Sequence, residues 1–185
     1  PLLVTGGIHM DGFMDTSDAR HSYGEREKKL AILKDPHTGA FAVMSAAIYL
    51  LWSLALWSAA DEKVLPGMAC AMVLSRTLSG LSVTVGKGAK SDGLAAVFRE
   101  SARQKAVWIS TGIYLAVCVI FLAVVSGVIP AVLLLFTAGA VFARYLRMAV
   151  REFGGITGDL AGWFLQVFEL TALTVLTAWS WMIRF

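Results

Sequence analysis

Three aspartates near the start of the chain have a spacing that suggests chemistry. In the segment GGIHMDGFMDTSDAR, Asp11, Asp15 and Asp18 follow one another at i, i+4 and i+7, which places their carboxylates along one face of a helix. Like charges on one stripe repel each other, and a cation among them removes that repulsion. Hard oxygen ligands in this pattern suit Mg²⁺ or Mn²⁺ rather than zinc. The spacing predicts a magnesium site, with a solvated acidic helix start as the alternative.

Residues around this stripe supply further groups that such chemistry needs. His9 precedes Asp11 by two positions, and Gly12 lets a ligand approach the backbone closely. The segment KDPHTGAF places Asp35 directly before a proline, which pushes it out of helical geometry. Asp35 belongs either to a simple turn that begins the next helix, or to the site as a metal ligand or general base. His9 is the other candidate base.

Several polar residues are candidates for binding a phosphorylated substrate. The loop GKGAKSDGLAAVF interleaves glycines and lysines, a weak signal for a phosphate cradle that the distribution of charge across a membrane explains equally well. Arginines inside apolar segments either extend to the surface or hold phosphate from inside a bundle. The Gly-rich turn in REFGGITGDLAG ends on an aspartate that caps a helix or touches substrate, and the role of Glu169 is open. The substrate-binding candidates are Gly12, Lys34, Arg76, Lys87, Lys90, Arg144, Arg147 and Asp159.

Apolar helices must position these residues. The chain has 185 residues, of which 57% are hydrophobic and 16% charged, and its mean hydropathy is +0.70. A soluble domain carries about a quarter charged residues, and a chain of this size cannot bury so much apolar surface. We therefore predict an all-α, polytopic membrane bundle forming one catalytic domain over residues 1–185. The expected spans run roughly over 41–60, 64–83, 106–129, 130–150 and 160–183.

The basic residues indicate how the bundle sits in a membrane. Fourteen of the sixteen lysines and arginines fall toward one side, and only Lys63 and Arg184 fall toward the other. This predicts a multi-pass protein of the cell (inner) membrane whose acidic N-terminal segment faces the cytoplasm. The basic residues flank the spans and form no patch, which argues against nucleic-acid binding. Two cysteines, both in apolar runs, exclude a disulfide-stapled secreted fold. Because Pro1 is not an initiator, we expect one or two preceding spans to be missing.

Four motifs, in order, resemble the cobalamin synthase family, the adenosylcobinamide-GDP ribazoletransferases of the last steps of vitamin B12 assembly. They are GGIHMDGFMDTSDA, LAILKDPHTGAF, LSR with GAKSDGLAAVF, and FGGITGDLAG. The resemblance spans nearly the whole chain and implies a multi-pass, Mg²⁺-dependent enzyme. Its reaction joins α-ribazole, or its 5′-phosphate, to adenosylcobinamide-GDP and releases GMP. One departure is that Ala19, Arg20 and His21 stand where many members have a glycine-rich stretch, which leaves the neighbouring substrate contacts open.

Other classes of protein share parts of this pattern. A CDP-alcohol phosphotransferase of phospholipid synthesis also uses Asp-rich helices and Mg²⁺, but the Ala19–Arg20 pair comes too late for its usual spacing. A membrane prenyltransferase repeats its Asp pair in a second loop, and this chain has no second pair. A transporter with Arg76, Arg144 and Glu169 lining a pathway should show an internal repeat, which is absent. The pattern is compatible with a homo-oligomer and leaves the oligomeric state open.

Overall fold

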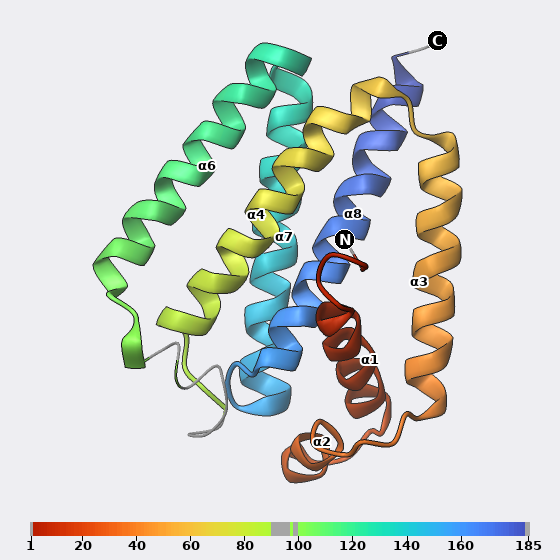
Figure 1. Cartoon of the computed structure of the whole chain (residues 1–185), viewed down its shortest axis with the longest axis vertical. Coiled ribbons are helices and arrows are strands. Elements are labelled where there is room, and N and C mark those ends of the chain that lie inside the picture. The colour runs from red at the N-terminus through yellow and green to blue at the C-terminus, as the bar shows by residue number, and fades with distance from the viewer. Residues whose placement is uncertain (1, 90–96, 98–99, 184–185) are drawn as a thin grey trace.

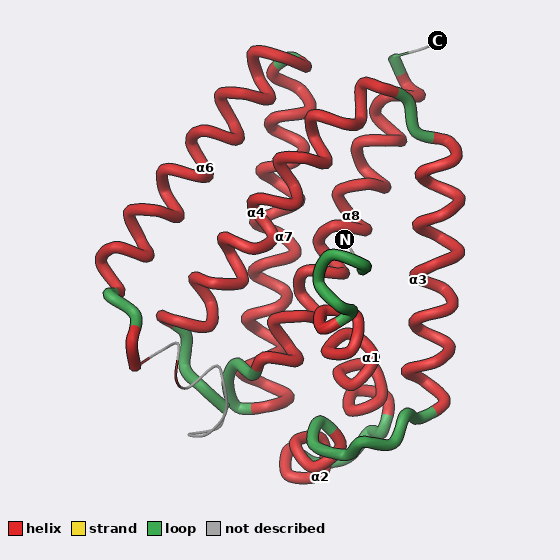
Figure 2. Tube along the Cα trace, viewed as in Figure 1, coloured by secondary structure: helices red, strands yellow, loops and turns green. Residues whose placement is uncertain are grey.

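The chain folds into a bundle of helices in a computed structural model that describes residues 2–89, 97 and 100–183 (Figure 1). Within these residues the regular structure is helical, and Figure 2 shows the loops that connect the helices at the two ends, with the N-terminal loop between them. The elements are α1 (Ile8–His21), α2 (Arg26–Ile32), α3 (Ala40–Ala59), the 3-10 turn η1 (Glu62–Val64), α4 (Leu65–Val85), α6 (Gln104–Ser126), α7 (Val128–Phe153) and α8 (Gly158–Met182). The predicted all-α class is confirmed.

Five of these helices are long and apolar enough to cross a membrane. They cover 40–59, 62–85, 104–126, 128–153 and 158–182, within a few residues of the spans that the sequence predicts. The sharp turn between α6 and α7 falls at Gly127, whose φ of 95° is a left-handed conformation that favours glycine. The length and apolar composition of the helices are those of a multi-pass membrane protein.

Helix α8 forms the centre of the bundle and packs against α1, α3, α4 and α7 (Figure 1). Its side chains are buried along most of its length, which explains why its sequence is apolar almost all round. The ring of Phe164 stacks on Tyr145 of α7 at a centroid distance of 5.0 Å and on Phe168 at 5.9 Å. This aromatic core fixes α8 as the element against which the others are placed.

The short helix α1 lies directly against α8, with α3 on its other side. A Cβ atom at Gly12 would stand 2.7 Å from the carbonyl oxygen of Asp159, and one at Gly162 would stand 3.1 Å from the carbonyl oxygen of His9. Two glycines therefore let the helix backbones touch, as small residues do in membrane helix pairs. In this packing Gly12 brings the acidic helix beside Asp159.

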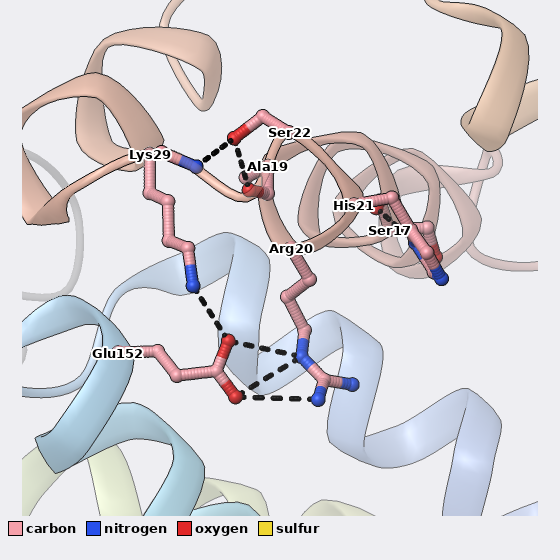
Figure 3. Close-up of polar contacts among 8 residues, drawn as sticks. Ser17, Ala19, Arg20, His21, Ser22, Lys29 and Glu152 are labelled. Carbon is pink, nitrogen blue, oxygen red and sulfur yellow. Dashed lines mark hydrogen bonds and ion pairs between the residues drawn. The ribbon is translucent and has the colours of Figure 1, made fainter.

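The loops at the end of the bundle near α2, which we call the α2 end, are joined to one another. Ile156 donates its N–H to the Lys87 carbonyl at 2.8 Å, and Ala89 donates to the Ile156 carbonyl at 3.1 Å. Glu152 of α7 binds Arg20 of α1 and Lys29 of α2, which ties these three helices together (Figure 3). The α2 end is therefore held by contacts between segments far apart in sequence.

We expect Gly12→Ala to separate α1 from α8, because its Cβ would meet backbone atoms that cannot rotate away. The variant should show a lower thermal midpoint of unfolding in detergent and less of the folded protein. Gly139→Ala on α7 is the matched control, since its Cβ would meet nothing within 4 Å, and it should leave the midpoint unchanged or slightly higher. Equal midpoints for both variants would contradict the close packing.

Candidate functional site

The acidic face of α1 gathers carboxylates around Asp15. Asp15 is half-buried and Asp11 is exposed one turn earlier. Burial raises the pKa of Asp15 to about 6, and the negative charges of Asp11, Asp159 and Asp18 raise it in the same direction. Three of these groups are the stripe predicted from sequence. The fourth, Asp159, arrives from the first turn of α8 because of the close α1–α8 packing.

Asp18 has a structural role that its spacing did not indicate. Its Oδ2 accepts the N–H of Gly39 at 2.6 Å, and its Oδ1 accepts the N–H of Ala42 at 2.9 Å. These N–H groups lie at the start of α3, whose own N-cap residue, Gly39, has no side chain to accept them. The carboxylate of Asp18 therefore caps α3 from another helix. Each oxygen keeps a further lone pair, so its role as a metal ligand stays a prediction.

The chemistry of these donors fits a hard divalent cation. Several carboxylates whose mutual repulsion raises the pKa of Asp15 are the oxygen donors that Mg²⁺ takes. In the described part of the chain, no three His, Cys, Asp or Glu side chains are already placed to hold one ion together. A cation at this face would therefore draw Asp11 and Asp15 toward each other and relieve their repulsion.

His9 lies at the start of α1, where the charges of Arg76 and Glu169 act on it. Burial lowers the pKa of His9, the Arg76 guanidinium lowers it further, and the Glu169 carboxylate partly opposes this. An imidazole with a lowered pKa is neutral at pH 7 and able to accept a proton. The environment of His9 therefore suits the general base that the sequence proposed.

Arg76 and Glu169 form an ion pair between α4 and α8. The Arg76 Nη1 also donates to the Met72 carbonyl at 3.0 Å and to the Ser75 hydroxyl at 2.7 Å, and the same hydroxyl lies 2.7 Å from Glu169 Oε1. This pair supplies the partner that a charged group inside a membrane needs. Arg76 was a phosphate-binding candidate, and the structure shows that its nearest anion is Glu169.

Asp35 lies in the exposed loop between α2 and α3. Its Oδ1 accepts the backbone N–H of His37 at 2.9 Å and contacts the His37 ring at 2.7 Å. The backbone hydrogen bond, followed by the ring contact, lowers the pKa of Asp35, which makes this carboxylate a weaker base. Asp35 therefore contacts its own loop rather than α1, and its catalytic role stays a prediction.

The remaining substrate-binding candidates are spread over the α2 end. Lys34 and Lys87 are exposed, and the backbone of Lys87 is fixed by the bonds to Ile156. Arg144 and Arg147 are exposed on α7, so the interpretation that they hold phosphate from inside the bundle is wrong. Their long side chains extend outward instead. Lys90 lies outside the described residues.

Asp159 sits in the first turn of α8, where a carboxylate interacts favourably with the helix dipole. The neighbouring Thr157 caps the helix by accepting the N–H of Leu160 at 3.2 Å, and its hydroxyl lies 3.5 Å from Asp159 Oδ2. Because Thr157 caps α8, the carboxylate of Asp159 is not the cap. Its charge acts on Asp15 in the acidic face of α1.

Sequence reasoning missed the charged cluster around Glu152 (Figure 3). Arg20 Nη2 lies 3.2 Å from one Glu152 oxygen, and Lys29 Nζ lies 2.9 Å from the other. The Arg20 guanidinium also lies 5.6 Å from the centre of the Trp163 ring on α8. The only signal for this cluster in the sequence was Glu152 itself, one acid beside the arginines at the end of an apolar span. The cluster holds the C-terminal end of α1 in place.

The geometry can be compared with known proteins. A family model described as Cobalamin-5-phosphate synthase matches residues 1–177. The chain belongs to this family. The match favours the resemblance over the CDP-alcohol phosphotransferase and transporter alternatives. No solved structure matches the chain significantly.

The curated relatives in this cobalamin-5-phosphate synthase group carry a transferase name. The chain is 47% identical over 172 residues to an adenosylcobinamide-GDP ribazoletransferase of Lachnoclostridium phytofermentans, covering 93% of this chain and 66% of that protein. It is 35% identical to one of Clostridium perfringens, covering 95% and 70%, and 33% identical to one of Geobacillus kaustophilus, covering 99% and 70%. The chain thus spans about two thirds of the length of these relatives, and it is a member of a transferase family.

We expect Asp18→Ala to destabilise this cobalamin-5-phosphate synthase family member by about 1–2 kcal/mol, the usual cost of losing a helix cap. The reason is that two N–H groups at the start of α3 lose their acceptor. Asp11→Ala, on the exposed part of the same stripe, serves as the control and should leave stability nearly unchanged. Thermal unfolding in detergent measures both. A loss no greater for Asp18→Ala than for Asp11→Ala would refute the capping role.

The raised pKa of Asp15 predicts how stability depends on pH without a divalent cation. The folded protein holds this proton up to about pH 6 and the unfolded chain only to about 3.8. The folded state therefore gains stability as the pH falls through 6 toward 4 and loses it as the pH rises. In EDTA, we expect Asp15→Asn to raise the unfolding midpoint at neutral pH and to flatten its pH dependence. An Asp15→Asn profile parallel to the wild-type profile would contradict this.

Proposed function

We propose that the chain catalyses the Mg²⁺-dependent joining of α-ribazole, or of its 5′-phosphate, to adenosylcobinamide-GDP with release of GMP. The family match and the names of the relatives support this activity. The observation that carries it is the negative charge that Asp11 and Asp159 place on Asp15 where α1 packs on α8. Such a face suits the transfer of a phosphoryl group from a nucleoside diphosphate, because charge neutralisation does most of the catalysis in that reaction.

Asp11 and Asp15 are the residues proposed to hold Mg²⁺, with Asp18 and Asp159 beside them. When bound, the ion would neutralise the pyrophosphate oxygens of the donor. Asp18 also accepts two N–H groups at the start of α3. These bonds hold α3 against the helix that carries the carboxylates. The protein thus contributes position and negative charge rather than a covalent nucleophile.

The acceptor must lose a proton during the reaction. A ribose hydroxyl of the nucleoside attacks the phosphorus attached to cobinamide, a new O–P bond forms, and the bond to the GMP oxygen breaks. His9 is proposed to take the hydroxyl proton, because its lowered pKa keeps the imidazole neutral. Asp35, the other candidate, lies in an exposed loop and contacts His37. The lysines and arginines of the α2 end would attract the phosphorylated substrates.

The proposed location is the cell membrane, with the α2 end facing the cytoplasm. Lys34, Lys87, Arg144 and Arg147 all belong to this end of the bundle, whereas Lys63 follows α3 at the opposite end. This asymmetry supports the proposed orientation by the positive-inside rule. The site would then face the compartment that supplies nucleotides.

The direct test incubates the protein in phospholipid nanodiscs with adenosylcobinamide-GDP, α-ribazole and Mg²⁺ and measures GMP release. We expect no release in excess EDTA, and a loss of at least about a hundredfold in Asp11→Asn and Asp15→Asn, as is usual for metal-held groups. Glu62→Gln, exposed at the opposite end of the bundle, should keep wild-type turnover. Full GMP release in EDTA would refute the metal dependence, and no release at all would refute the activity.

A further inference from the structure

A cavity of about 190 Å³ lies between α3, α4 and α8, outside the acidic face. Its walls are mainly apolar. They include the aromatic side chains of Tyr49 and Trp57 from α3 and the flexible Met72 from α4. Two polar side chains of α8, Gln166 and Glu169, interrupt this lining. An apolar cavity with a few polar groups is the usual form of a small-molecule site.

Gln166 places an amide in this lining. The residue is only 5% exposed, and its amide makes no hydrogen bond with the residues that the structure describes, yet it is not one of their fully enclosed unpaired groups. The amide therefore faces the space of the cavity, where it can bind an occupant. Since Gln166 lines the cavity, a molecule bound there would provide the missing hydrogen bond.

Glu169 stands beside it on the same wall. Its two donors, Ser75 Oγ and Arg76 Nη1, both bind Oε1, and neither uses Oε2. On α8 the polar lining is thus one amide and one carboxylate, spaced i and i+3, and Ser53 of α3 adds a hydroxyl. A purely apolar occupant such as a lipid chain leaves the Gln166 amide without a hydrogen-bond partner.

The cavity adjoins the acidic helix. Glu169, in its polar wall, and the ion-pair partner Arg76 are the charges that act on His9 in the first turn of α1. The ring of Tyr49, also in the wall, lies 5.5 Å from the Phe13 ring one turn further along α1. A molecule held in the cavity therefore lies next to the first two turns of α1, which carry His9 and Asp11.

We propose that this cavity binds the heteroaromatic base of the nucleoside substrate and leaves its ribose beside His9 and Asp11. The assignment rests on the proposed function, which requires such a nucleoside. A flat bicyclic base is mainly apolar, matches the aromatic lining, and offers ring nitrogen to the Gln166 amide. The corrinoid ring of the other substrate is several times larger and does not fit a space of 190 Å³.

The test replaces Gln166 by Leu, which keeps the volume and removes the amide. Because the amide has no partner in the described protein, Gln166→Leu should unfold at the wild-type temperature or above it. Its KM for α-ribazole should nevertheless rise at least tenfold, with an unchanged KM for adenosylcobinamide-GDP. Calorimetric titration of the protein in nanodiscs with α-ribazole, and with benzimidazole as the free-base probe, should show the same loss of affinity without turnover.

Thr177→Val is the matched control. Thr177 lies on the same helix, its buried hydroxyl also has no partner among the described residues, and it does not line the cavity. It should match the stability of Gln166→Leu and keep both wild-type KM values. Wild-type affinity for α-ribazole and benzimidazole in Gln166→Leu would overturn the proposal and assign the cavity to lipid or protein. If wild-type protein releases no GMP, the proposed function fails, and the titrations still decide whether the cavity takes the base.

Discussion

The contact between the backbones of α1 and α8 is the constraint on which the rest of the site depends. Gly12 faces the backbone of Asp159, and Gly162 faces that of His9. Because the backbones approach so closely, the charge of Asp159 on α8 acts on Asp15 of α1. Without a hydrophobic driving force inside a membrane, such close packing is a main source of helix association. The acidic face thus exists because two glycines stand at the crossing.

This arrangement concentrates negative charge, and the surrounding helices compensate for it in different ways. The carboxylate of Asp18 accepts two N–H groups at the start of α3. Arg76 forms an ion pair with Glu169 between α4 and α8. Arg20 and Lys29 meet Glu152 at the α2 end. The charges that act on Asp15 are those of Asp11, Asp159 and Asp18, and all three are negative. A cation at this face would be stabilised by them.

Periodicity and hydropathy were sufficient to predict the helices and the stripe of α1. A stretch of about 20 apolar residues has few alternatives to a membrane helix, and the i, i+4, i+7 spacing of Asp11, Asp15 and Asp18 fixes their shared face. Contacts between distant segments were beyond such reasoning. Nothing local indicates that Asp18 caps α3, that Glu169 meets Arg76, or that Gln166 lines a cavity. These depend on which helices become neighbours, and packing decides that.

The position of α8 in the chain has a consequence for biosynthesis. Helix α1 and helix α8 stand at opposite ends of the described sequence, yet each needs the other to form the acidic face. During synthesis the earlier spans are inserted before α8 leaves the ribosome. Until then α1 lacks its packing partner, and its aspartates stay in contact with water. The acidic face can therefore assemble only after α8 has been inserted. A polypeptide whose synthesis stops before α8 would lack the helix against which α1 packs.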